Sequence, residues 1–247
     1  MGNYKFIGNK LVVGILEKLQ NPIIINSIPV SAGKVLSEQY RKIKEVYPYF
    51  STTHTSINRV DKNLLTINFL FVGRLENLKR IDDAIHALGI LYNNNITNFH
   101  FHIVGDGKEK ERLKTLAQEQ GILDFITFHG YISQSNQIEE LYKKSNIFLF
   151  PSISEGTPKV LAEAMSFGTI PIAVKTTGSI PYIIEDKKNG FLVNAQSPKE
   201  IAESIEELLN DEKLYTQMIE NCYEYAQEHT LQKEVEKMWN YIFHELD

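Results

Sequence analysis

Two glutamates flank the predicted start of a helix in the second half of the sequence. Thr157 is a predicted N-cap residue and Pro158 suits the first helical position. Glu155 then lies just ahead of the free backbone N–H groups of the helix, and such a position favours anions. Glu163 follows about a turn and a half into the helix, where its carboxylate can accept hydrogen bonds from both hydroxyls of a ribose. The alternative is that Glu163 belongs to a solvated helix face.

A second group of polar residues follows an apolar run that ends at Val72. Gly73, Arg74 and Leu75 come directly after it, and Lys79 lies close to the next predicted helix. Open α/β sheets bind ligands at the carboxyl ends of their strands. There, an arginine fork, a lysine and a helix N-terminus can converge on a phosphate. Taken alone, these residues are explained more simply as an exposed basic loop.

The elements that must position these residues alternate regularly from Thr66 onward. Short β-rich runs are followed by amphipathic helical stretches, which is typical of βαβ units and a parallel sheet. We therefore predict an α/β fold with a Rossmann-like parallel sheet flanked by helices. The predicted strands are Ile67–Val72, Phe99–Val104, Ile126–His129, Ile147–Phe150, Ile170–Val174 and Phe191–Val193. The predicted helices among them are Ile81–Tyr92, Lys108–Gln120, Ile138–Lys144 and Lys159–Phe167, with a short helix before the last strand.

The two ends of the chain follow other patterns. After Pro198 the sequence predicts three helices, at Glu200–Asn210, Glu212–Gln227 and Leu231–Leu246. The last one carries so much apolar surface that it must dock on another part of the protein. Near the N-terminus we predict helices at Asn9–Leu19 and Ser31–Val46, a strand-like run at Ile23–Ile25, and a linker from Tyr47 to Asn63.

Composition narrows the classes of function. With 43% apolar residues the chain can bury a core, and a formal net charge of -5 argues against a general affinity for nucleic acid. The single cysteine, Cys222, excludes an intramolecular disulfide and fits a reducing, cytoplasmic compartment. The apolar runs are far shorter than the about 20 residues that a membrane-spanning helix needs. Peripheral attachment to the inner face of a membrane stays open.

Together, these motifs resemble the GT4 family of retaining glycosyltransferases. The resemblance rests on Glu155 and Glu163 with seven residues between them, on the Gly-Arg-Leu segment with Lys79, and on a downstream run from Gly178-Ser179-Ile180-Pro181 to Asn189-Gly190-Phe191-Leu192-Val193. It extends from Thr66 to about Asn210. It implies the C-terminal, donor-binding half of a GT-B fold.

The resemblance also implies roles for individual residues. The family positions that match Arg74 and Lys79 hold the donor diphosphate, that of Glu155 contacts the sugar, and that of Glu163 binds the ribose. The remaining implied donor-site positions are Gly73, Gly105, Tyr131, Ile132, Gly156, Thr157, Val160 and Leu161, with Tyr131 and Ile132 in a loop that faces the base.

The implied donor is a UDP-, GDP- or ADP-sugar, and no metal cofactor is expected. The sequence has no Asp-x-Asp motif, so the two basic side chains would stabilise the leaving diphosphate. Retention can follow two inversions with Glu155 as nucleophile, or front-face attack in which the departing phosphate takes the acceptor proton. The resemblance favours front-face attack.

The chain has too few residues for both Rossmann-like domains of a GT-B enzyme. We expect residues 1–65 to be a remnant of the acceptor domain plus a linker, 66–230 the nucleotide-sugar domain, and 231–247 a helix that packs back on the N-terminal part. The acceptor, a glycan or glycolipid, would then be bound by a separate acceptor-domain polypeptide, by another domain of a longer parent protein, or by a homodimer. The alternative to an enzyme is a non-catalytic nucleotide-sugar-binding module derived from one. A sugar-nucleotide 2-epimerase or a phosphorylase is a weaker alternative.

Overall fold

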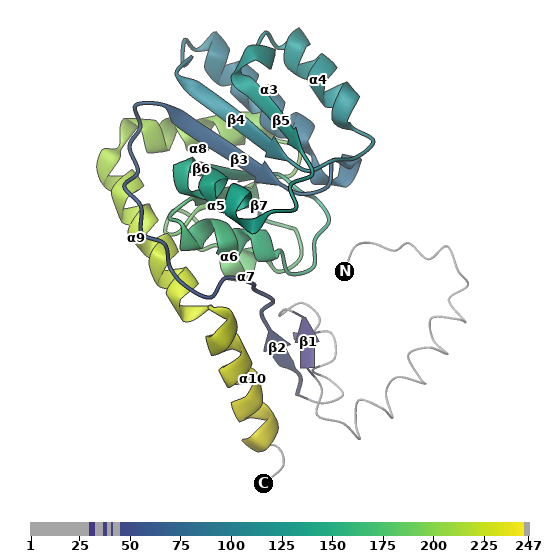
Figure 1. Ribbon diagram of the computed structural model, residues 1–247, viewed down its shortest axis with the longest axis vertical. Helices are drawn as coiled ribbons and strands as arrows, with labels where there is room; N and C mark the ends of the chain where they lie inside the picture. Colours follow the sequence, from purple (N-terminus) through teal and green to yellow (C-terminus); the bar gives the residue numbers. More distant parts are fainter. Residues whose placement is uncertain (1–29, 33–36, 39–40, 42–44, 245–247) are drawn as a thin grey trace, which may run out of the picture.

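A parallel sheet of six strands forms the centre of the protein (Figure 1). The computed structural model describes residues 30–32, 37–38, 41 and 45–244. The strand order is β5-β4-β3-β6-β7-β8. The strands are β3 (Ile67–Val72), β4 (Phe99–Val104), β5 (Ile126–Gly130), β6 (Ile147–Phe150), β7 (Ile170–Val174) and β8 (Phe191–Val193). The order reverses direction between β3 and β6, which is where doubly wound sheets bind ligands.

Helices cover both faces of the sheet and confirm the predicted α/β class (Figure 1). α3 (Ile81–Asn93) packs against α4 (Lys110–Glu119) and α8 (Pro198–Asn210). α5 (Ser135–Lys144) contacts β3, and α6 (Lys159–Ser166) packs against α9 (Glu212–Glu228). The connection from β3 to β4 through α3 and the connection from β5 to β6 through α5 cross the sheet in opposite directions. Because such connections are right-handed, α3 and α5 lie on opposite faces. Three short helices complete this part: η1 (Asn77–Lys79), η2 (Leu123–Phe125) and α7 (Ile180–Ile183).

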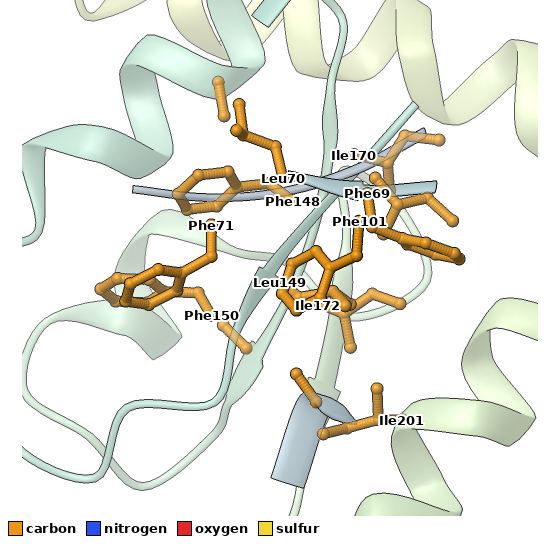
Figure 2. Close-up of a cluster of buried hydrophobic side chains, with 14 of the residues drawn as sticks. Phe69, Leu70, Phe71, Phe101, Phe148, Leu149, Phe150, Ile170, Ile172 and Ile201 are labelled. Carbon is orange, nitrogen blue, oxygen red and sulfur yellow. The ribbon is translucent and has the colours of Figure 1, made fainter. Parts of the chain in front are cut away.

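The core consists of large side chains from the central strands. Phe69, Phe71, Phe101 and Phe148 are fully buried, and Figure 2 shows them with leucine and isoleucine side chains of the neighbouring strands. Every residue of β6 and β7 is buried, because parallel strands between two helical layers are covered on both faces. This packing fixes the sheet edge from which the candidate site residues project.

Most predicted elements of the sheet domain are confirmed. β3, β4, β6, β7 and β8 have the predicted bounds. α5 begins at Ser135, three residues before the predicted start, and α4 begins at Lys110 rather than Lys108. These differences lie within the usual uncertainty of helix ends.

Two predictions for the N-terminal part are wrong in part. The predicted helix Ser31–Val46 is contradicted at its start by β1 (Val30–Ala32), although Ser37 and Glu38 are helical. The predicted linker from Tyr47 to Asn63 is contradicted at its first residues by β2 (Tyr47–Tyr49), but residues 50–63 form no helix or strand. The two strands pair in parallel, so a contact between distant segments overrides the local pattern. The predictions at Asn9–Leu19 and Ile23–Ile25 lie outside the described residues.

Residues 50–65 are attached closely to the sheet domain. Asn58 N–H donates to the Ser166 carbonyl at 2.9 Å, and Arg59 forms an ion pair with Glu220. Lys62 donates to the carbonyls of Tyr142 and Ser145, at the end of α5, and its distance to the Tyr142 oxygen is 2.9 Å. A lysine in this position stabilises the free carbonyls of a helix C-terminus.

The C-terminal helix α10 (Leu231–His244) extends toward β2 (Figure 1). Tyr241 stacks on Tyr47 with ring centroids 5.0 Å apart. Tyr241 is therefore in contact with β2, whereas Trp239 and Phe243 of the same helix are 49% and 58% exposed. Among the described residues, no helix combines the length and the apolar character needed to cross a membrane.

Candidate functional site

Three glycines bring together the loops that follow β3, β4 and β5. Gly73 N–H donates to the Val104 carbonyl at 3.0 Å, and Gly105 N–H donates to the Gly130 carbonyl at 2.8 Å. Gly105 has a φ of +130°, and a Cβ at this position would lie 1.8 Å from the Gly73 oxygen. Only glycine permits this approach. The predicted positions Gly73 and Gly105 are thus adjacent at the carboxyl edge of the sheet.

Lys79 and Glu155 form an ion pair beside these loops. Ile153 N–H donates to the Leu78 carbonyl at 2.9 Å, which joins the loops after β3 and β6. The Lys79 Nζ atom lies 2.5 Å from Glu155 Oε1, and the two side chains are only 16% and 12% exposed. Shelter from water strengthens this attraction. An ammonium group has three donors, so Lys79 can bind an anion while it holds Glu155.

Arg74 forms an ion pair with a different carboxylate. Its guanidinium contacts Glu76 at 2.8 Å, and its side chain is 76% exposed. Arg74 and Lys79 thus pair with different glutamates, Glu76 and Glu155, and their convergence on a phosphate stays a prediction. An exposed pair of this kind contributes little to stability, so Arg74 can reorient toward an anionic ligand at small cost.

The loop from Glu155 to Thr157 rests on the loop after β7. Ser179 N–H donates to the Gly156 carbonyl at 2.9 Å. Gly178 has a φ of +49°, and a Cβ there would lie 2.2 Å from the Glu155 carbonyl oxygen. Backbone contact between the two loops thus fixes where Glu155 stands.

The predicted N-cap at Thr157 is wrong. α6 begins at Lys159, and Pro158 at the N-cap position has an extended backbone. The Thr157 hydroxyl faces Ser179 Oγ at 3.4 Å, and no side chain in the described structure caps α6. The helix start, with Val160 and Leu161 in its first turn, is therefore open to an anionic ligand.

Glu163 lies one turn into α6 and is held by two hydroxyl groups. Thr53 Oγ1 donates to Glu163 Oε1, and Tyr142 Oη donates to Glu163 Oε2 at 3.2 Å. Burial, together with the nearby Glu163 carboxylate, raises the pKa of Tyr142 well above its usual value. Tyr142 is therefore a neutral hydrogen-bond donor. The sequence did not point to either hydroxyl: Thr53 lies in a Ser- and Thr-rich segment, which is typical of loops, and Tyr142 lies in a predicted helix without a motif.

A cavity of about 380 Å³ lies beside Glu163. Its walls come from α5, from α6 and from the segment at residues 53–58. Most of its lining residues carry hydroxyl or carboxylate groups: Thr53, Thr55, Ser56, Ser135, Glu139, Tyr142, Glu163 and Ser166. Such a lining suits a ligand with several hydroxyl groups.

The loop after β5 presents the residues that were expected to face a base. Tyr131 is 80% exposed. Ile132 is half-buried and, with His129, lines a groove of about 720 Å³ beside α5.

His129 Nε2 lies 3.1 Å from His102 Nδ1. Burial, and secondarily Lys144, lowers the pKa of His102 to about 3. Among the described residues, no group of histidine, cysteine or acidic side chains is arranged to hold a metal ion.

Comparisons with known proteins agree on one family. The family model for glycosyl transferases group 1 matches residues 55–225. An uncharacterized glycosyltransferase of Haemophilus influenzae is 31% identical over 237 residues, which make up 95% of this chain and 66% of that protein. A Campylobacter jejuni α-1,4-N-acetyl-D-galactosaminyltransferase, named for the substrate GalNAc-α-(1→4)-GalNAc-α-(1→3)-diNAcBac-PP-undecaprenol, is 29% identical over 154 residues, with 62% of this chain and 41% of that enzyme covered.

The fold is shared with solved glycosyltransferase structures. The pneumococcal O-GlcNAc transferase GtfA in complex with UDP and GlcNAc superposes with a TM-score of 0.74 at 21% identity, over 88% of this chain and 45% of that one. The chain thus spans about two thirds of the Haemophilus relative and less than half of the pneumococcal enzyme.

Proposed function

Because the chain belongs to the glycosyl transferases group 1 family, we propose that it binds a nucleotide diphosphate-sugar and transfers the sugar, with retention, to a glycan or lipid-linked acceptor. One arrangement carries this proposal. The sheltered Lys79–Glu155 pair lies just ahead of the uncapped start of α6, and Glu163 stands one turn further along the same helix. An anion site and a hydroxyl-binding carboxylate are thus next to each other, as a nucleoside diphosphate requires.

The proposed mechanism depends on stabilising the leaving group. A departing nucleoside diphosphate gains negative charge, which fixed cations and N–H groups stabilise in advance. We assign this role to Lys79, to Arg74 after it turns from Glu76, and to the amides at the start of α6. No metal ion is part of the proposal, since the basic side chains supply the positive charge.

We assign Glu155 the role of orienting the transferred sugar. Its carboxylate is already fixed by Lys79 at 2.5 Å, and a paired carboxylate is a weaker nucleophile than a free one. This favours front-face attack, with the departing phosphate as the proton acceptor, over a covalent intermediate on Glu155.

Relatives suggest where to begin the search for the donor. The Campylobacter enzyme is named as an N-acetylgalactosaminyltransferase, and the pneumococcal structure contains UDP and GlcNAc. We therefore propose a hexose or N-acetylhexosamine as the sugar, with UDP tested before GDP and ADP, in a reaction at the cytoplasmic side of a membrane.

Transfer is proposed to need an acceptor-binding half in addition to residues 66–230. The Haemophilus relative is half as long again as the part that this chain covers, which supports the need for such a half, whether it belongs to a longer parent protein, to another polypeptide or to a second copy. The alternative is a non-catalytic nucleotide-sugar-binding module. Binding without turnover, after a candidate acceptor domain is added, would favour that second function.

Isothermal titration with UDP, GDP and ADP tests the donor site. One nucleotide should bind with saturation, and Arg74→Ala and Glu163→Ala should each weaken binding about tenfold, the equivalent of one charge-assisted hydrogen bond. Arg59→Ala is the matched control. Arg59 is also exposed and forms an ion pair with a glutamate, but this glutamate is Glu220 on α9 and does not belong to the proposed donor site. Absence of binding to all three nucleotides would refute the proposal.

A further inference from the structure

We propose that Thr53 is a positioning residue of the donor site, which holds the Glu163 carboxylate in the orientation that receives a ribose. The inference rests on the proposed function, because it takes Glu163 as the ribose ligand. It adds a residue that lies outside the family motifs and ahead of the first strand of the sheet.

The Glu163 carboxylate is held from two sides by hydroxyl groups on different elements. Thr53, in the segment before β3, donates to one oxygen, and Tyr142, on α5, donates to the other at 3.2 Å. Two donors restrict the side-chain rotamers of a glutamate that is otherwise free to turn. An ionised carboxylate has about four acceptor positions, so two of them stay available for the ribose hydroxyls.

Thr53 is itself fixed, because both of its neighbours are buried. Thr52 and His54 are 4% and 9% exposed. His54 Nε2 lies 2.8 Å from the Ala226 carbonyl oxygen, so this nitrogen is the donor, and Nδ1 then accepts from the Thr52 hydroxyl at 2.6 Å. Leu231 N–H donates to the His54 carbonyl at 2.9 Å. The backbone at Thr53 is thereby tied to the junction of α9 and α10.

The position of Thr53 also defines one wall of the cavity beside Glu163. The segment at residues 53–58 closes the groove between α5 and α6. The nucleoside part of the donor would therefore contact the segment that leads out of the sheet domain as well as the sheet domain itself.

The test compares ribose recognition in hydroxyl variants of Thr53. The probe is whichever of UDP, GDP and ADP binds the wild-type chain most tightly, together with its 2′-deoxy form. Thr53→Val, which removes only the hydroxyl, should weaken binding of the ribonucleotide about tenfold and bring the ratio of the two affinities close to one. Thr53→Ser should keep the wild-type ratio. Thr115→Val is the control, since this hydroxyl bonds a helix carbonyl on α4.

A merely structural role for Thr53 would change both affinities equally, and an unchanged ratio in Thr53→Val would overturn the proposal. A double-mutant cycle of Thr53→Val and Glu163→Ala, in which urea unfolding without nucleotide gives the free energy of each variant, tests the contact independently. Additive effects would overturn it. If the two changes are coupled but the wild-type chain binds no nucleotide, the proposed function fails, and the ribose role of Thr53 fails with it, while the contact stands.

Discussion

The ion pair between Lys79 and Glu155 stabilises both residues, because both side chains are largely shielded from water. Their ammonium and carboxylate groups are 2.5 Å apart and less than a fifth exposed, and Lys79 also lies over the Phe150 ring at 6.0 Å. A sheltered charge that loses its partner keeps its desolvation penalty. The same pair is thus a structural contact in the free protein and a pair of ligand-binding residues in the proposed complex.

Replacement of Lys79 separates these two roles. Lys79→Met should lower the free energy of unfolding by about 1 to 3 kcal/mol, because Glu155 is left unpaired, and should weaken nucleotide binding at least tenfold. Adding Glu155→Gln should restore much of the stability but none of the binding. Urea unfolding and calorimetry measure the two effects. Lys114→Met, which breaks the exposed pair with Glu111, should change neither, and equal effects of both lysine variants would contradict the prediction.

His102 makes the sheet sensitive to acid. Burial holds its pKa at about 3 in the folded protein, and the pKa values of His100 and His129 are lowered too. The unfolded chain takes up a proton near pH 6.5, whereas folded His102 stays neutral until far lower pH. The contribution of neutral His102 to the free energy of unfolding is therefore retained above pH 6.5. It decreases as the pH drops, by about 2 kcal/mol at pH 5. Urea midpoints measured from pH 7.5 to 5 should fall less steeply in His102→Gln, and parallel profiles would contradict this assignment.

At the scale of elements, the loop after β7 supports the loop that carries Glu155. Gly178 adopts a φ of +49° with the Glu155 and Gly156 carbonyl oxygens close by. A methyl group at this position has to displace the backbone that precedes α6. The geometry of the anion site therefore depends on a residue that does not touch the ligand.

Gly178→Ala should reduce nucleotide affinity about tenfold or more, because a shift of the Glu155 loop displaces both the carboxylate and the start of α6. Gly121→Ala is a matched control. Its φ of +71° imposes a similar backbone strain, but the nearest atom to an added Cβ is in the Tyr92 ring at 3.8 Å. Both variants should lose about 1 kcal/mol of stability from the positive φ, and Gly178→Ala should lose more, because its Cβ also meets backbone atoms. Calorimetry should detect weakened binding only in Gly178→Ala, and unchanged affinity there would show that the loop tolerates the shift.

The sequence predicts those elements whose pattern is local. β3 and β4 follow from short β-rich runs, and α6 follows from its apolar period, so their bounds agree with the structure within a residue. β1 and β2 have three residues each and exist through their pairing, which no local window contains. For the same reason Glu163 could be predicted from its motif, but its contact with Thr53 could not.

At the scale of the molecule, α10 carries the chain away from the sheet domain and onto β2. The stack of Tyr241 on Tyr47 and the hydrogen bond from Tyr241 Oη to the Glu45 carbonyl, at 3.2 Å, join segments from the two ends of the sequence. At the base of the helix, Glu234 is buried and holds His229 and Lys237 at 2.8 and 2.9 Å. The helix is therefore anchored at both of its ends.

Tyr241 and Trp239 lie on the same helix, but among the described ring contacts Tyr241 stacks on β2 and Trp239 does not. We therefore expect different effects when each is replaced by alanine. Tyr241→Ala removes the contact with β2, so the far end of α10 should open more often and trypsin should cleave after Lys237 several-fold faster. Trp239→Ala is the control, because Trp239 is half exposed and stacks only on Phe243 of its own helix among the described ring contacts. Urea unfolding of the sheet domain should be unchanged in both. Equal cleavage of the two variants would mean that the Tyr47 contact does not hold the helix, and that Glu234 alone determines its direction.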